Sequence, residues 1–221
     1  MKIPYAEARA LLRETRHGAL GTHSQTHPGF PFVSILPYVA DLRGWPVFLV
    51  SGLAEHTRNL RADPRASFMV VGEGEDVLTT PRVSLVGEVR EVALDAAAQA
   101  RYLRYRPEAA EYLALGDFRF FALEPLAVRL VSGFARTGWL NPERPAWVPE
   151  GAEEGAAVAR LQRLAPPGVS VLGLDGDGLD LQVLGQLRRW HLALPDLAAL
   201  EYEAEAVLRQ LTVPDAMPPL A

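Results

Sequence analysis

Residues that could hold an anion gather in one stretch of this chain, directly after an apolar segment. Ser51 and Gly52 follow the apolar run 47–50, and residues 54–62 contain good helix formers. A helix that begins there directs its free N–H groups, and the positive end of its dipole, towards whatever lies beyond the preceding strand. This arrangement suits a phosphate group when hydroxyls and cations lie nearby. The polar and basic side chains of the stretch are Ser51, His56, Thr57, Arg58, Arg61 and Arg65.

The same stretch also has a purely structural interpretation. Ser51 is a residue type that caps helices, and the arginines could be solvated or paired with Glu55 and Asp63. Ser51, His56 and Asp63 do not form a hydrolase triad, because no nucleophile elbow surrounds the serine. Spacing alone leaves both the anion site and the structural interpretation open.

The remaining candidates for ligand chemistry are histidines, because the 221 residues include five histidines and no cysteine. The lack of cysteine excludes disulfides, thiolate ligands and cysteine nucleophiles. His23 and His27 lie four residues apart in a loop, but two ligands without a third are a weak metal signal. His17 and His191 are each interpreted as a structural histidine or as a ligand that faces a cofactor.

The composition is that of a folded protein, with 49% hydrophobic and 22% charged residues. The formal net charge of −5 gives no general electrostatic attraction for nucleic acid, so DNA or RNA is a poor first hypothesis. Residues 1–5 lack the apolar core of a signal peptide, and no apolar run is long enough to span a membrane. We therefore expect a cytoplasmic protein without a membrane partner.

The anion-binding stretch lies within a predicted unit of strand, turn, strand, helix and strand. The apolar, β-branched runs 32–40 and 47–50 flank residues 41–44, where an Asp and a Gly suit a reversal of the backbone. The helix that follows ends at Asp63-Pro64, because the residue before a proline is pushed out of the α region. Residues 66–71 are apolar again and short enough for a buried strand.

Further elements surround this unit. Helices are predicted over 5–15 and 95–104, with a helical turn at 108–115. Together the strands number about six, and their spacing is that of an antiparallel barrel rather than of repeated βαβ units. Residues 133–139 are expected to leave the barrel. The remaining strands are predicted at 19–22, 82–92, 117–123 and 127–131.

A second, smaller domain is expected after a linker at 141–151, which holds three prolines. The Asp-Gly-Asp-Gly sequence at 175–178 is a clear hairpin signal within it. The predicted fold class is therefore α+β, with a barrel domain at 1–145 and a small α+β domain at 150–221. The second domain is predicted to contain helices over 152–164 and 196–211 and strands over 169–174, 179–184 and 186–194.

A known family shares the element order and the sequence of several segments of this chain. These segments are 16–22 (RHGALGT), 51–60 (SGLAEHTRNL), 63–67 (DPRAS), 81–87 (PRVSLVG), 102–103, 107–109, 117–118 and 133–136. They resemble the FMN-binding split-barrel family, which has the fold of pyridoxamine-phosphate oxidase. The resemblance is closest to its haem-utilisation branch, the HugZ-type proteins, which also carry a small C-terminal α+β domain. It implies a six-stranded antiparallel split β-barrel with flanking helices.

In this family the barrel is a homodimer, and the flavin lies in a groove between the subunits. The resemblance implies that one strand runs along the isoalloxazine ring of FMN with Ser34, Ile35, Leu36 and Pro37. It also implies that the ribityl phosphate is surrounded by Val50, Ser51, His56 and Thr57. Arg82 would lie close to this site, and Arg136 or Trp139 would reach the flavin of the second subunit.

Two departures from the family pattern argue against oxidation of vitamin B6. Pyridoxamine oxidases carry basic residues on the first hairpin strand, whereas residues 32–40 contain none. Their basic motif near the C-terminus is also missing, since the tail after Leu211 holds no Arg or Lys.

Three functional hypotheses follow from the sequence. The first is a homodimeric FMN-binding oxidoreductase that acts on a small redox substrate, in which the flavin carries the electrons. The second is haem binding or haem breakdown, with His191 or His17 as the ligand of the iron. The third is a non-catalytic dimer whose groove binds something else.

Overall fold

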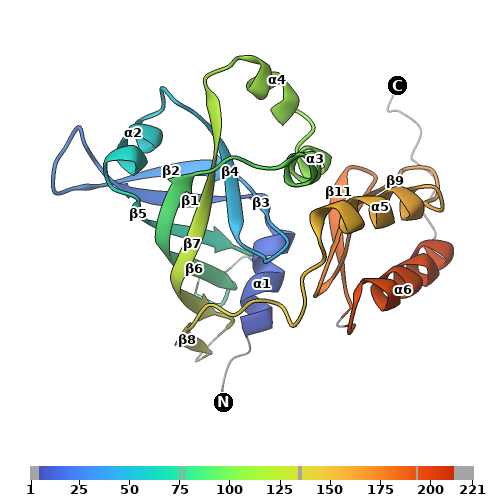
Figure 1. Ribbon diagram of the computed structural model, residues 1–221. Helices are drawn as coiled ribbons and strands as arrows, with labels where there is room; N and C mark the ends of the chain where they lie inside the picture. The colour runs from blue at the N-terminus through green and yellow to red at the C-terminus, as the bar shows by residue number, and fades with distance from the viewer. Residues whose placement is uncertain (1–4, 75, 77, 134–135, 193, 212–221) are drawn as a thin grey trace, which may run out of the picture. The chain divides into compact units, whose positions relative to one another are not determined.

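The computed structural model describes residues 5–74, 76, 78–133, 136–192 and 194–211, and the chain divides into two compact units (Figure 1). Unit 1 comprises Met1–Asp95 and Arg106–Arg144, and unit 2 comprises Ala96–Tyr105 and Pro145–Ala221. Helix α3 (Ala96–Tyr105) thus belongs to unit 2, although its sequence interrupts that of unit 1. The domain ranges expected from the sequence, 1–145 and 150–221, stay a prediction.

Unit 1 is a curled antiparallel sheet with flanking helices (Figure 1). Its strands are β1 (His17–His23), β2 (Pro31–Pro37), β3 (Val39–Ala40), β4 (Pro46–Ser51), β5 (Arg65–Val71), β6 (Arg82–Glu91), β7 (Phe118–Val131) and β8 (Thr137–Leu140). Its helices are α1 (Tyr5–Glu14), α2 (Glu55–Ala62) and α4 (Ala109–Ala114). The strand order is β2-β1-β5-β6-β7-β4-β3, with β8 paired to β7. This architecture confirms the predicted α+β class and the antiparallel barrel.

The turn predicted at residues 41–44 connects β3 and β4. The Asp41 carboxylate accepts hydrogen bonds from two backbone N–H groups of this turn at 2.9 Å each, and Gly44 adopts a φ of +92°, which favours glycine. The sequence predicts one strand over 32–40, but the structure divides this run at Tyr38. The Tyr38 side chain turns into the core, where its hydroxyl donates to a carbonyl of α1 at 2.6 Å.

The sequence predicts two strands at 117–123 and 127–131, whereas the structure has one long strand, β7. Proline cannot donate a ladder hydrogen bond, so Pro125 is accommodated where the register between β6 and β7 shifts, opposite Gly87. A Cβ atom on Gly87 would lie 2.1 Å from the Glu124 carbonyl oxygen, so glycine is required at this close approach. Strand β8, which the sequence pattern does not predict, extends the sheet beyond β7.

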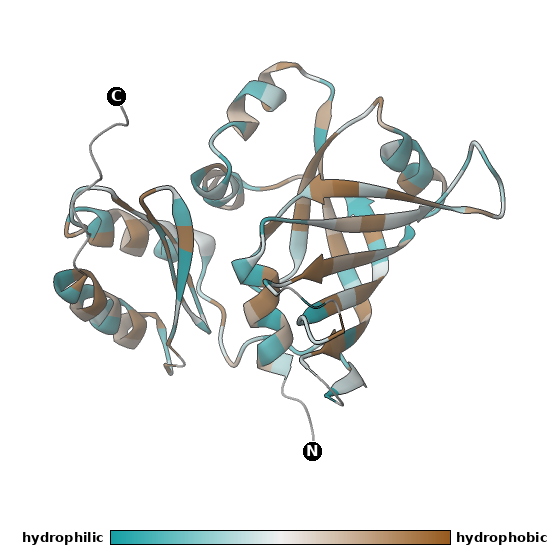
Figure 2. Ribbon diagram, turned by 180° about the vertical axis from the view of Figure 1, so that it is seen from behind, coloured by the Kyte–Doolittle hydropathy of each residue, from teal (hydrophilic) through white to brown (hydrophobic). Residues whose placement is uncertain are grey.

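The core of unit 1 is formed by the inner side of the curled sheet and one side of α1. Buried and exposed residues alternate along β5 and along most of β6, as expected for strands with one buried face. Phe48, Phe68 and Phe121 are at most 1% exposed, and the rings of Phe48 and Phe68 meet edge to face at a centroid distance of 5.0 Å. Figure 2 shows apolar residues, in brown, along the strands of unit 1. The alternation leaves a second set of side chains that points away from this core.

Unit 2 combines a three-stranded sheet with helices (Figure 1). Besides α3 it contains β9 (Val169–Asp175), β10 (Gly178–Val183), β11 (Gln186–His191), α5 (Gly151–Gln162) and α6 (Leu197–Gln210). The predicted hairpin at 175–178 joins β9 and β10. Asp196 caps α6, because its side chain accepts a hydrogen bond from the Ala199 N–H at 2.8 Å. None of the helices in the described ranges is long and apolar enough to cross a membrane.

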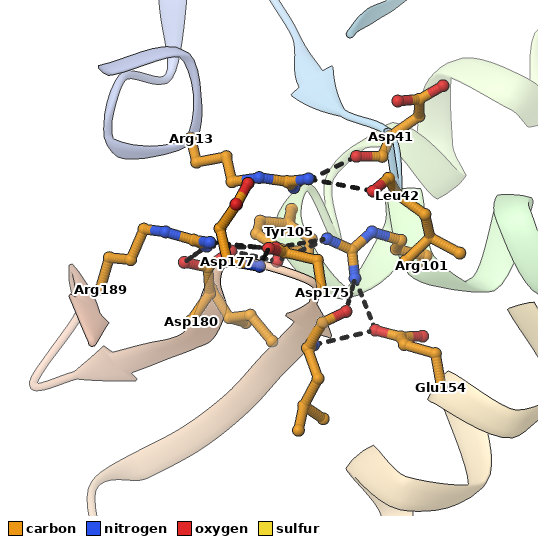
Figure 3. A network of polar contacts seen from close by, with 12 residues as sticks. Arg13, Asp41, Leu42, Arg101, Tyr105, Glu154, Asp175, Asp177, Asp180 and Arg189 are labelled. Atoms are coloured by element: carbon orange, nitrogen blue, oxygen red, sulfur yellow. Dashed lines mark hydrogen bonds and ion pairs between the residues drawn. The ribbon is translucent and has the colours of Figure 1, made fainter. Parts of the chain in front are cut away.

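Unit 2 also holds a network of charged side chains in its interior (Figure 3). Arg189 donates to Asp175 and Asp180 at 2.7 Å each, and all three side chains are at most 1% exposed. Arg101 of α3 pairs with a glutamate of α5 at 2.5 Å. Tyr105 of α3 donates to Asp180 at 2.6 Å, and burial raises the pKa of this phenol well above its usual value. These contacts fix α3 within unit 2.

Candidate cofactor site

The hydroxyl groups of the predicted anion-binding stretch are engaged within the protein. Ser51, the last residue of β4, donates from Oγ to the Asp117 carboxylate at 2.6 Å and accepts from the backbone N–H of Leu53 at 3.1 Å. Thr57 of α2 is fully buried and donates from Oγ1 to the Ser51 carbonyl at 2.7 Å. Both hydroxyl protons are therefore used by protein acceptors, and the Asp117 carboxylate would repel a phosphate at this position.

The arginines of this stretch are paired or bonded to the backbone. Arg61 pairs with a glutamate of β6 at 2.9 Å, and Arg65 pairs with Asp63 at 2.5 Å. Arg58 donates to a backbone carbonyl at 2.8 Å. The structural interpretation of the sequence is thus correct for Arg65, but it is wrong about the helix cap. The N-cap residue of α2 is Ala54, which provides no side-chain hydrogen bond.

The structure brings Ser34 of β2 to His56 of α2, with Ser34 Oγ and His56 Nδ1 3.3 Å apart. The second ring nitrogen, Nε2, is buried and finds no hydrogen-bond partner in the part of the chain that the structure describes. Burial lowers the pKa of His56, so the imidazole is neutral near pH 7. A neutral imidazole offers no fixed positive charge to a phosphate, although it could orient a polar group of a ligand.

Three other predicted site residues are occupied by contacts within unit 1. Leu36 and Val50 are 7% and 4% exposed, so their side chains belong to the core and only their backbone groups could meet a ligand. Arg136 pairs with Glu7 of α1 at 2.8 Å. Their roles beside a flavin stay predictions.

The remaining predicted residues of unit 1 share one surface, which we call the outward face. Cross-strand pairing forms a row in which Ile35, Ala19 and Met69 are followed by Ser84, Arg129 and Trp139. Residues two positions along each strand point to the same side of the sheet, so the neighbouring rows belong to this face as well. With those rows, the outward face comprises His17, Ala19, Gly21, Val33, Ile35, Pro37, Ser67, Met69, Val71, Arg82, Ser84, Val86, Arg129, Val131, Thr137 and Trp139.

The outward face is apolar at the β2 and β5 strands. Val33, Ile35, Met69 and Val71 are exposed by 61%, 71%, 38% and 46%. An apolar patch of this kind on a folded protein marks a place where a ligand or a partner binds. His17 lies beside the patch, since it is exposed and pairs in register with Pro37 of β2.

The other candidate haem ligand lies in unit 2. His191 is the exposed last residue of β11 and pairs in register with Gly178 of β10. Within the described ranges, no three His, Asp or Glu side chains come together to hold a metal ion.

The sequence did not identify three residues as part of a site. Asp117 lies beside Ser51, and Met69 and Arg129 lie on the outward face. Asp117 stands 66 positions from Ser51, and no local pattern links the two residues. Met69 and Arg129 could have been found from strand alternation, because each lies on the polar or exposed phase of a predicted strand.

The comparisons with known proteins agree on the barrel. The family model described as "CREG, beta-barrel" matches residues 5–145. The non-canonical heme oxygenase HOZ of Arabidopsis thaliana, a chloroplastic protein, is 37% identical over 134 residues, which are 60% of this chain and 41% of that protein. The chain thus aligns with less than half of the length of this relative.

Two solved structures resemble the chain over nearly its whole length. A heme binding protein from Mycobacterium smegmatis has a TM-score of 0.59 and 29% identity, and the match covers 96% of this chain and 100% of that one. The protein Atu2129 from Agrobacterium tumefaciens, of unknown function, has a TM-score of 0.71 and 26% identity, with 94% and 99% covered. These matches confirm the split-barrel fold and the resemblance found in the sequence.

Proposed function

Since the chain belongs to the CREG β-barrel family, and two of the proteins it resembles are named for haem, we propose that it binds haem as a homodimer. Its fold is related to haem-binding and flavin-binding split barrels. The observation that carries the choice of haem is the outward face, where a broad apolar surface adjoins both a histidine and arginines.

The outward face fits the chemistry of haem. The macrocycle is flat and apolar, and exposed apolar side chains are offered by Val33 and Ile35 of β2 and by Met69 of β5, two strands that flank β1. The iron takes a neutral imidazole as a ligand, and His17 stands at the edge of the same patch. When bound, haem would supply the redox and oxygen chemistry, and the protein would supply the surface, the ligand and the charges.

The proposed dimer uses the same patch. Burial of the exposed side chains of Val33 and Ile35 between two copies would remove apolar surface from water, which favours association. A haem held in the groove between two outward faces would meet apolar side chains from both subunits. The predicted homodimer with its cofactor at the interface is therefore kept in this proposal.

Ile35→Asp tests the patch, with Leu53→Asp as the matched control. The side chains of Ile35 and Leu53 have the same size and are 71% and 76% exposed, but of these two only Ile35 lies on the outward face. A carboxylate at position 35 would face the macrocycle, so we expect haemin affinity to fall at least about tenfold and the dimer to dissociate. Soret titration and analytical ultracentrifugation measure the two effects. Equal haemin affinity in the two variants would contradict the proposal.

His17→Ala tests the iron ligand. We expect loss of His17 to shift the Soret maximum and to weaken haemin binding, because the imidazole is the proposed ligand. His191→Ala should leave the spectrum unchanged. If instead His191→Ala changes the spectrum and His17→Ala does not, the iron ligand is His191 of unit 2.

FMN is the second candidate, and one observation favours it. Ala54 leaves the start of α2 without a side-chain cap, so the first N–H groups of this helix could receive a phosphate. The charges nearby oppose it, because Asp117 and Glu55 are acidic and Ser51 already donates to Asp117. If FMN binds, Ser51→Ala, His56→Ala and Arg82→Ala should each weaken its retention on desalting.

Haem breakdown is the activity that follows from the name of the Arabidopsis relative, and we include it in the proposal. Loss of the Soret band on addition of a reductant in air, with formation of a bile pigment, would support it. A haem that stays intact would restrict the function to binding. A cytoplasmic location also stays a proposal, to be checked by fractionation.

A further inference from the structure

A hollow of about 610 Å³ lies on the outward face, next to the β5 side of the apolar patch. It is bounded by β6, β7, β8 and residues of the connection that precedes β6. Among the residues that line it are Arg82, Ser84, Arg129 and Thr137. Two guanidinium groups and two hydroxyl groups are the donor types that recognise carboxylates.

Arg129 contributes to this hollow a guanidinium group that stacks on an aromatic ring. Its guanidinium lies 5.6 Å from the ring centroid of Trp139, which pairs with it across β7 and β8. Among the residues that the structure describes, no carboxylate forms an ion pair with Arg129. Stacking on an indole holds the guanidinium in place and leaves its donors available to a ligand.

Arg82 lies close to Arg129 on the same face. The register pairs Ser84 with Arg129 and Arg82 with Val131, so the two arginines are diagonal neighbours on β6 and β7. Arg82 also donates to the Thr80 carbonyl at 3.3 Å. The acidic residue Asp76 also borders the hollow, and its carboxylate accepts a hydrogen bond from the backbone N–H of Leu78 at 2.9 Å. Arg82 makes further contacts within the protein, so Arg129 is the guanidinium on which binding of an anion here depends.

We propose that this hollow binds a propionate carboxylate of haem, with Arg129 as its principal contact. The inference rests on the proposed function, which it deepens by fixing the orientation of the ligand on the outward face. Met69 and Arg129 belong to one row two strands apart, a separation of about 10 Å at the usual strand spacing. Along this row the side chains change from apolar at Met69 to positively charged at Arg129. Haem is complementary to this arrangement, because it has an apolar macrocycle and negatively charged carboxylates at one edge.

The test compares haemin with its dimethyl ester, which lacks the two negative charges. Wild-type protein, Arg129→Ala, Arg129→Lys and Arg90→Ala are titrated with both ligands, and dissociation constants are taken from the Soret band. Arg90 is the control, because it also lies on β6 but is exposed and pairs with Glu88 at 2.7 Å. We expect Arg129→Ala to lose about tenfold in haemin affinity while its affinity for the ester is unchanged.

Arg129→Lys should keep part of the preference for haemin, since it retains the charge without the planar fork. Arg90→Ala should match the wild type with both ligands. Haemin affinity that is unchanged in Arg129→Ala, or an equal loss for haemin and ester, would overturn the inference while the proposed function survives. A wild-type protein that retains neither ligand would overturn the proposed function and this inference together.

Discussion

Arginine is used in opposite ways in the two units of this molecule. In unit 2, the Arg189 side chain is fully buried and holds two carboxylates at 2.7 Å. On the outward face of unit 1, Arg129 stacks on Trp139, and no carboxylate of the described chain pairs with it. A buried guanidinium cannot persist without counter-charges, whereas a partly exposed one can leave its charge to a ligand. The difference separates an arginine that builds the fold from one that is available for binding.

The largest effect should come from breaking the buried network. Arg189→Ala leaves Asp175 and Asp180 charged and 0% and 1% exposed, so we expect the free energy of unfolding to fall by about 3–5 kcal/mol. Urea denaturation measures it. The neighbouring Arg188→Ala is the control, because Arg188 is exposed and donates to Gln186 at 2.8 Å, and a change below about 0.5 kcal/mol is expected. Similar stability of the two variants would remove the contrast between the units.

A smaller effect is expected from Tyr105→Phe. The hydroxyl donates to Asp180 at 2.6 Å and accepts from Arg101 at 3.1 Å, and both partners are buried. Its loss leaves polar atoms unsatisfied in the interior, which should cost about 1–3 kcal/mol. Hydrogen exchange should also show faster opening of α3, since Tyr105 links this helix to β10. Unchanged exchange in α3 would mean that the network does not anchor the helix.

A pH dependence of stability should arise from His56 in unit 1. Burial lowers its pKa below the value near 6.5 of the unfolded chain, so between these two pKa values the unfolded state binds more protons. The stabilisation is complete above pH 6.5 and is lost as the pH falls through the folded-state pKa. Urea titrations between pH 5 and pH 7 should therefore show a shallower slope of stability against pH in His56→Gln. An equal slope in the wild type and in His56→Gln would mean that the His56 imidazole is not shielded from water.

The smallest effect on stability is expected from Arg129→Ala. Because Arg129 forms no ion pair with any residue that the structure describes, its replacement should change the free energy of unfolding by less than about 0.5 kcal/mol. Thermal or urea denaturation of the ligand-free protein checks this. A loss comparable to that of Arg189→Ala would show that both arginines are structural.

Local patterns in the sequence were enough to predict most of the elements. The turn at 41–44, the end of α2 at Asp63-Pro64 and the hairpin at 175–178 depend on residues that are neighbours in the chain. The alternation of apolar and polar residues predicted the strands, and the family resemblance predicted that they form a split barrel. The break at Tyr38 and the continuity of β7 through Pro125 depend on packing against distant segments.

The candidate site was less predictable for the same reason. Ser51 was a sound candidate for an anion site from its position before a helix, but its partner Asp117 comes from a distant segment. The pairing of α3 with unit 2 is equally non-local, since the counter-charges of Arg101 lie on α5 and β9. Patterns within one element show which side of a strand is exposed, and only the register across strands shows which exposed residues stand together.

Haem binding on the outward face is what we propose for this split barrel. Its most direct test is the absorption spectrum of the purified protein after separate incubation with haemin and with FMN, each followed by desalting. We expect a Soret band at about one haem per subunit in the first sample and little flavin absorbance in the second. Stoichiometric flavin without a Soret band would contradict it in favour of an FMN protein, and no chromophore in either sample would leave a dimer that binds something else.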